Sequence, residues 1–235
     1  MPGLFDGSVE QVLSAFPSHG LQELDKASLM NRVDSKFVLP KSHLLQVLQY
    51  CQSHYSVLEM AGIRKFQYQS CYFDNEKMDF FHSHQKGKLN RFKVRHRSYL
   101  DTASSFLEVK FKNNKGRTEK SRVVSSANPL TAIDESKAFL AKQHILDHRS
   151  LLLIQMGSYN RMSLANEKIG ERVTIDSDLQ FVDLTNGNKA SLDNTAIIEL
   201  KQTRHNRQSP LYQLMRAMAV RPQSFSKYCM GLALT

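Results

Sequence analysis

The chain has 235 residues, of which 41% are hydrophobic and 23% charged, and its formal net charge is +10 at pH 7. This apolar content is sufficient for a packed core and excludes a disordered or fibrous chain. The three cysteines are widely spaced and include no Cys-x-x-Cys pair. This pattern favours a reducing compartment over a disulfide framework or a zinc motif.

No part of the chain is typical of a targeting or membrane-spanning segment. The N-terminus has neither the basic stretch nor the apolar stretch of about 7–15 residues that marks a secretory signal. The longest purely apolar runs, such as Leu151–Ile154, are far shorter than the ~20 residues that cross a bilayer. We therefore expect a cytoplasmic protein that meets a membrane, if at all, through a membrane-protein partner.

The chain contains no Gly-, Pro- or Ser-rich linker and no internal repeat. We expect a single domain overall, in which residues 1–30 form an N-terminal helical segment and residues 31–235 form the main domain.

The predicted elements begin with helices. The range 9–30 has the apolar spacing of two short helices, with Pro17 between them. The range 32–39 is typical of a strand that ends at Pro40. An amphipathic helix is predicted over 41–50.

From Lys65 onward the apolar period changes from 3.6 to 2, which predicts strands. The strong candidates are 66–73, 91–99, 106–112, 118–124, 152–163, 172–178 and 195–201, and the weaker ones are 79–84 and 179–184. Helices are predicted over 129–146 and 210–220. The short turn Asn113–Gly116 and others like it favour antiparallel pairing. The predicted class is therefore α+β, with one large antiparallel sheet and flanking helices.

Positive charge is concentrated between Lys86 and Arg122, where twelve basic and three acidic residues give a net charge of +9. Strand alternation places four cations of the range 91–99 on one face: Arg91, Lys93, Arg95 and Arg97. The next two strands add further cations in the same alternation: Lys110, Lys120 and Arg122. Neighbouring strands would then build a two-dimensional field of positive charge, which indicates an anionic partner.

Three interpretations of this field are open. It could be an ordinary solvated sheet face, although like charges that face each other across strands destabilise a sheet. It could bind single-stranded nucleic acid, but stacking aromatics should then share the basic face, whereas Phe92 and Phe111 alternate away from the cations. It could also point inward and line a closed antiparallel barrel that holds a polyphosphate-type ligand.

A closed barrel needs about eight strands to enclose a small ligand, and the predicted strands are numerous enough. Further residues fit such an interior: Lys36, Arg161, Arg172, Glu199 and Lys201. A single carboxylate among many cations suits Mg²⁺ or Mn²⁺, because such an ion takes one or two protein carboxylates and phosphate oxygens supply further ligands.

The chain resembles the VTC domain, the polyphosphate polymerase domain of the vacuolar transporter chaperone complex, within the CYTH-like triphosphate tunnel metalloenzyme superfamily. The resemblance runs from about residue 28 to residue 230. The motifs that carry it occur in the family's order: Arg32-x-x-x-Lys36-Phe-Val, Ser70-Cys-Tyr72-Phe73-Asp74-Asn75, Arg91-x-Lys93-x-Arg95-x-Arg97, Phe106-Leu107-Glu108-Val109-Lys110, Lys120-Ser-Arg122, Tyr159-Asn160-Arg161, Ile198-Glu199-Leu200-Lys201 and Phe225-Ser226-Lys227-Tyr228.

The resemblance implies a closed antiparallel tunnel barrel in which the terminal phosphoryl group of ATP is transferred onto polyphosphate, assisted by Mn²⁺ or Mg²⁺. It implies catalytic positions at Lys36, Arg95, Arg97, Lys110 and Lys227. It implies phosphate binding by Arg32, Arg91, Lys93, Lys120, Arg122, Arg161, Arg172, Lys201 and Ser226. Glu199 is implied as the metal ligand.

One departure from the superfamily bears on the reaction. Its hydrolytic members usually begin with Glu-x-Glu-x-Lys, whereas this chain has Arg32-Val-Asp34-Ser-Lys36. A basic residue at an acidic metal position favours a polymerase over a triphosphatase of the same fold. A non-catalytic module that binds polyanions or nucleic acid is the remaining alternative.

Overall fold

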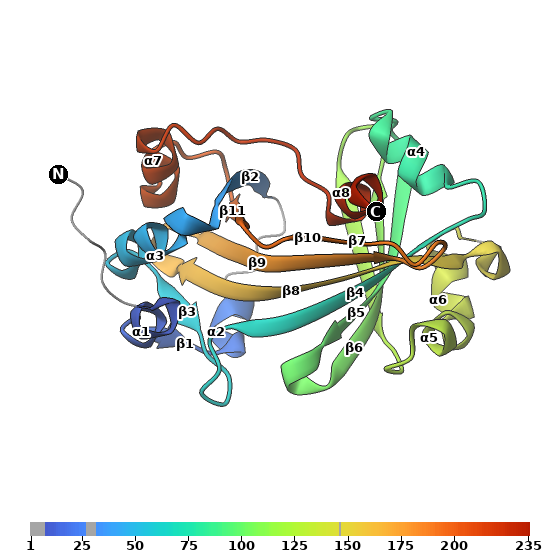
Figure 1. Ribbon diagram of the computed structural model, residues 1–235, viewed down its shortest axis with the longest axis horizontal. Helices are drawn as coiled ribbons and strands as arrows, with labels where there is room; N and C mark the ends of the chain where they lie inside the picture. Colours follow the sequence, from blue (N-terminus) through green and yellow to red (C-terminus); the bar gives the residue numbers. More distant parts are fainter. Residues whose placement is uncertain (1–7, 27–31, 146) are drawn as a thin grey trace. The chain divides into compact units, whose positions relative to one another are not determined.

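The computed structural model describes residues 8–26, 32–145 and 147–235 (Figure 1). The chain divides into two compact units, each assembled from three stretches. Unit 1 consists of Met1–Phe66, Asn160–Leu179 and Leu192–Phe225, and unit 2 of Gln67–Tyr159, Gln180–Ser191 and Ser226–Thr235. Two long strands, β8 (Leu152–Asn166) and β9 (Glu171–Asp183), contribute residues to both units.

In unit 1, β11 (Thr195–Gln202) pairs antiparallel with β2 (Val33–Pro40) and with β9. Alternation gives this sheet one apolar face, where Phe37 and Ile198 join the main core. That face packs against α1 (Val9–Ser14), α3 (Leu44–Gln52) and α7 (Pro210–Ala217). The smaller elements are β1 (Ser18–His19), α2 (Leu21–Lys26), η1 (Lys41–His43), β3 (Ser56–Leu58) and η4 (Glu167–Ile169).

In unit 2, four strands pair antiparallel in sequence order: β4 (Phe66–Asp74), β5 (Arg91–Tyr99), β6 (Ser104–Lys112) and β7 (Thr118–Val124). Their apolar face packs with buried residues of α5 (Pro129–Glu135) and α6 (Lys137–Lys142). The other elements are α4 (Asp79–Gln85), η2 (Leu100–Thr102), η3 (His148–Ser150), β10 (Lys189–Leu192) and α8 (Lys227–Leu234).

The α+β class and the antiparallel sheet are confirmed. The strands predicted with strong alternation are present with ends shifted by a few residues: 32–39, 66–73, 91–99, 106–112, 118–124, 152–163, 172–178 and 195–201. The weaker candidate 179–184 is the end of β9. In the region predicted as two short helices over 9–30, α1 and α2 are present, and the predicted residues 27–30 lie outside the described ones.

Two predicted elements need correction. The range 79–84 is not a strand, because the Asp74 carboxylate accepts hydrogen bonds from the backbone N–H groups of Phe80 and Phe81 and so fixes a helical turn there. The single helix predicted over 129–146 is two helices that meet at Ser136. Helix α8 was not predicted at all.

The predicted closed barrel is wrong for the residues that the structure describes. Hydrogen bonding takes the strands in the order β2-β11-β9-β8-β4-β5-β6-β7, and the end strands β2 and β7 are not paired with each other. Strand β7 has mostly exposed residues, charged ones among them, which is how natural edge strands avoid unwanted pairing. The number of strands alone does not determine closure, because closure also depends on tilt and register.

No helix within the described part of the chain is long and apolar enough to span a membrane.

A buried carboxylate fixes the start of α7 in unit 1. Glu171, only 2% exposed, accepts hydrogen bonds from the Tyr55 hydroxyl at 2.8 Å, the Gln202 side-chain amide at 2.8 Å and the Ser209 hydroxyl at 2.9 Å. Burial and the Glu171 charge raise the pKa of Tyr55, which keeps this hydroxyl a donor. Ser209 in turn caps α7.

We predict that Glu171→Ala lowers the free energy of unfolding by about 3 kcal/mol or more, because it leaves buried donors without an acceptor. Glu167→Ala, at an exposed position in η4, is the matched control and should change the stability by less than about 0.5 kcal/mol. Urea denaturation of both variants measures the difference, and equal stabilities would contradict the role given to Glu171.

Candidate functional site

The basic residues of unit 2 form one cluster across β5, β6 and β7, here called the β5–β7 cluster. Its members are Arg91, Lys93, Arg95, Arg97, Lys110, Lys120 and Arg122, with Glu108 among them. The register places Lys93 opposite Lys110, and Lys110 opposite Lys120. Three lysines therefore occupy one row across three strands, so the predicted field of positive charge is present in the sheet.

Glu108 is the anion within this cluster. Its carboxylate is fully buried, 2.5 Å from the Arg95 guanidinium and 2.5 Å from the Lys120 ammonium. Burial alone would raise its pKa, but the charges of Arg95, Arg97 and Lys120 outweigh burial and hold the pKa of Glu108 well below its usual range. Burial also opposes the charge of Arg95, and Glu108 more than compensates, so the pKa of Arg95 is raised. Both groups stay ionised inside the sheet.

Lys120 is in a different electrostatic position. About one third of its side chain is exposed, at 34%. Burial of the rest lowers the pKa of Lys120 to about 8, although the Glu108 charge acts in the opposite direction. The nearby charge of Arg95 adds to the lowering. Lys120 thus titrates close to physiological pH.

Arg97 is held in place by aromatic side chains of the protein itself, without a ligand. The residue is 6% exposed, and its guanidinium donates a hydrogen bond to the Tyr159 hydroxyl at 2.8 Å and lies 5.6 Å from the centre of the Tyr68 ring. The Lys227 ammonium lies over the same Tyr159 ring, 4.4 Å from its centre. Tyr159 therefore contacts two residues that were predicted as catalytic.

The start of α8 carries two further predicted residues, Ser226 and Lys227. The Ser226 hydroxyl caps the helix and accepts a hydrogen bond from the Lys93 ammonium at 2.8 Å. The helix is anchored two residues after Ser226, where the buried Tyr228 hydroxyl donates a hydrogen bond to the Asp74 carboxylate at 2.7 Å. This hydrogen bond joins the Asp74 and Tyr228 motifs, which are far apart in the sequence, within unit 2.

Unit 1 holds a second group of predicted residues, here called the β2–β11 cluster: Arg32, Lys36, Arg161, Arg172, Glu199 and Lys201. Glu199 lies opposite Lys36 in the register. Its carboxylate is 3.8 Å from the Lys36 ammonium and 3.4 Å from the Lys201 ammonium. Lys36 also donates a hydrogen bond to the Phe225 carbonyl at 3.1 Å.

The surrounding cations of the β2–β11 cluster are partly neutralised. Arg161 donates two hydrogen bonds to the Asp176 carboxylate, at 2.6 and 2.8 Å, and Asp176 is 2% exposed. Arg172 lies opposite Lys201 in the register. Burial lowers the pKa of Lys201, while the Glu199 charge acts against this shift. Arg32 is paired with Asp34 at 3.0 Å at the exposed end of β2.

The donor set of Glu199 fits a divalent metal only in one way. Among residues 8–26, 32–145 and 147–235, no three His, Cys, Asp or Glu side chains converge as a metal cage. Mg²⁺ in phosphoryl-transfer sites takes one or two carboxylates and completes its shell with water and substrate oxygens. Glu199, 21% exposed and flanked by two lysines, can supply that one carboxylate when phosphate supplies the remainder.

A family model of the VTC domain matches residues 31–235. The chain belongs to the VTC domain family. A comparison of the VTC domain sequence with curated proteins finds no match.

Solved structures of three other proteins resemble the fold of this VTC domain. A candidate adenylyl cyclase from Hippeastrum, described as revealing a dominant triphosphatase activity, is 15% identical with a TM-score of 0.55, covering 87% of this chain and 96% of that chain. A candidate adenylate cyclase from Bacillus halodurans is 13% identical with a TM-score of 0.53, covering 83% and 94%. A Pyrococcus horikoshii protein is 14% identical with a TM-score of 0.51, covering 86% and 98%. At these identities the likeness concerns the fold alone.

Three residues that were not predicted as site residues contact predicted ones. Glu108 and Asp176 hold cations in place from within the sheet, and Tyr159 holds Arg97. Glu108 and Tyr159 lie within motifs that carry the family resemblance, whereas Asp176 lies outside them. The sequence signal for Glu108 was its place on the cationic face of its strand, but only the register shows which cations it contacts.

We predict that Glu108→Gln destabilises the VTC domain by about 3–5 kcal/mol, because it removes the partner of buried cations. The control is Glu119→Gln on exposed β7, which should change the free energy of unfolding by less than about 0.5 kcal/mol. Chemical denaturation distinguishes them. A loss of the same size in both variants would show that Glu108 has no special role.

A second prediction concerns pH. Raising the pH through about 8 removes the charge of Lys120, so the affinity of the β5–β7 cluster for a triphosphate should fall between about pH 7.5 and 9. Terminal phosphate groups, with a last pKa near 6, keep their charge over this range. Lys120→Arg stays charged and should flatten the profile. Calorimetric titration measures both, and an identical slope in the two proteins would contradict the assignment.

Proposed function

We propose that this VTC domain transfers the terminal phosphoryl group of ATP onto a polyphosphate chain and releases ADP. The observation that carries the proposal is the row of Lys93, Lys110 and Lys120 across three strands. Like charges in adjacent register positions destabilise a sheet. A phosphate chain laid along this row would convert that repulsion into binding.

In the proposed reaction the protein positions the two phosphate chains and neutralises their charge, and no covalent intermediate with the protein is needed. A terminal oxygen of the polyphosphate attacks the γ-phosphorus of ATP, the bond between that phosphorus and the bridging oxygen of ADP breaks, and ADP carries the electron pair away. Such transfers are accelerated by in-line positioning and by cations around the transferring oxygens. In the proposal the β5–β7 cluster, with Arg95, Arg97 and Lys110, supplies those cations, and Lys227 at the start of α8 adds one.

The β2–β11 cluster has a related role in the proposal. Lys36 and Lys201 bind phosphate oxygens, and Glu199 holds Mn²⁺ or Mg²⁺. The ion, when bound, neutralises charge on the phosphate oxygens. The remaining predicted phosphate ligands are Arg32, Arg91, Lys93, Lys120, Arg122, Arg161, Arg172 and Ser226. Arg32 stands where hydrolytic relatives carry an acid, which supports a longer anion over a second metal.

Hydrolysis is the second candidate. The Hippeastrum structure, with its described triphosphatase activity, shares the fold and favours it. The two reactions differ only in the acceptor, which is water in one and a phosphate chain in the other. The cytoplasm is the proposed setting, because the three cysteines are free and buried and ATP is the proposed donor. A membrane-protein partner stays part of the proposal.

The deciding experiment incubates the purified protein with ATP and Mn²⁺ and resolves ADP, free phosphate and polyphosphate separately. We expect ADP and polyphosphate to form together. Glu199→Gln keeps the side-chain shape and removes the charge, so the rate should fall about 100-fold or more. Glu167→Gln, exposed in the same unit, is the control and should keep the rate.

Each other outcome has a distinct meaning. If free phosphate forms and polyphosphate does not, the protein is a triphosphatase and not a polymerase. ATP binding without turnover, lost on raising the salt concentration, would leave a polyanion-binding module.

A further inference from the structure

A second concentration of positive charge lies in unit 1, outside the β2–β11 cluster. Residues 202–225 contain four Arg and no Asp or Glu. Three of these cations, Arg207, Arg216 and Arg221, line a cavity of about 500 Å³. No carboxylate is among the described residues that line it. A cavity with three guanidinium groups and no acid is built for an anion.

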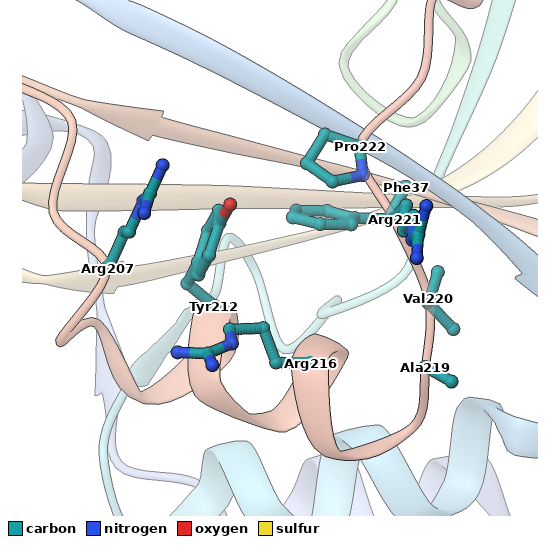
Figure 2. Close-up of a pocket in the computed structure, with 8 residues that line it drawn as sticks. All are labelled: Phe37, Arg207, Tyr212, Arg216, Ala219, Val220, Arg221 and Pro222. Carbon is teal, nitrogen blue, oxygen red and sulfur yellow. The ribbon is translucent and has the colours of Figure 1, made fainter.

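Aromatic and aliphatic groups make up much of the remaining wall. Figure 2 shows the rings of Phe37 and Tyr212 between Arg207 on one side and Arg221 on the other. The two rings meet edge to face, with centroids 6.0 Å apart. Arg216 follows Tyr212 by four residues on α7, so both side chains lie on the same side of the helix. The cavity thus offers an apolar surface and cations together.

The walls of this cavity are fixed before any ligand arrives. The N-cap of α7 is Ser209, which is completely buried and donates a hydrogen bond to the Glu171 carboxylate. After α7, the Val220 N–H donates to the Met215 carbonyl at 2.8 Å, and the Gln223 N–H donates to the Lys36 carbonyl at 2.8 Å. A preformed cavity lowers the entropic cost of binding.

The cavity is separate from the β2–β11 cluster. Consecutive residues of a strand point to opposite faces. Lys36 contacts Glu199 on one face of β2, whereas Phe37 belongs to the core on the other face and lines the cavity. A ligand in the cavity therefore does not occupy the proposed phosphate positions of that cluster.

We propose that this cavity binds a nucleoside phosphate. The arginines would hold its phosphate groups, and the partly exposed Tyr212 ring, which packs edge to face against the buried Phe37 ring, would contact its base or ribose. The volume falls within the range of about 300–1,000 Å³ that is typical of small-molecule sites. An inorganic phosphate chain would leave the aromatic wall without a partner, which is why a ligand with a ring fits better. The proposal does not depend on the polymerase activity.

The test uses the absence of Trp from the sequence. Tyr212→Trp keeps an aromatic ring in the wall and places the only indole of the protein there. Titration of this variant with ADP should give a saturable change in fluorescence, with ADP binding at least about tenfold tighter than either pyrophosphate or adenosine. Adding Arg216→Ala should weaken ADP about tenfold or more, because one charge-assisted hydrogen bond is lost. Arg149→Ala, an exposed arginine of unit 2, should leave it unchanged.

Two further measurements separate this site from the proposed active site. Lys110→Ala in the Tyr212→Trp background should keep the fluorescence signal even though it weakens the proposed reaction. In the protein with its original Tyr212, equilibrium dialysis with labelled ADP should show one site fewer after Arg207→Ala and Arg216→Ala are combined. Equal affinity for pyrophosphate, an equal effect of Arg149→Ala, or an unchanged number of sites would overturn the proposal.

Discussion

Burial of the Glu108 carboxylate among Arg95, Arg97 and Lys120 is the interaction on which the charged sheet of unit 2 depends. An isolated carboxylate inside a protein costs several kcal/mol, and so does an isolated guanidinium. Together they offset each other, and the geometry at 2.5 Å makes the pairing close. The Glu108 carboxylate is fully buried. It therefore holds Arg95 and Lys120 in place but leaves some of their N–H groups available to a ligand.

The consequence is a set of cations that is ordered before a ligand binds. One carboxylate faces more than one cation, so positive charge remains in the row that contains Lys93 and Lys110. Arg161 and Asp176 repeat the arrangement in unit 1. Preorganised charges do not have to reorient when charge develops on a phosphate, and this is the largest single source of rate enhancement in many enzymes. The buried acids are therefore part of the proposed function, although they do not touch the phosphate.

The sequence predicted the strands of this fold well because their signal is local. Alternation predicts a strand over 91–99, and β5 begins and ends at these residues. Closure of the sheet and the helix at 79–85 depend on distant or capping contacts, such as Asp74 with the backbone of α4, and no periodicity reports them. The same holds for the site. Cations could be predicted from spacing, but the partners of Glu108 required the register of three strands.

Consecutive residues of β2 belong to two different proposed binding sites, one on each face of the strand. Lys36 contributes to the β2–β11 cluster, and Phe37 to the cavity beside α7. The chain that closes the cavity at Arg221 continues to Phe225, whose carbonyl accepts the hydrogen bond of the Lys36 ammonium. A ligand in the cavity can influence Lys36 only if it binds two arrangements of this segment with different affinity. The hydrogen bonds of Gln223 and Phe225 to Lys36 are the physical route for such an effect, because they tie the segment to the strand at both its backbone and its side chain.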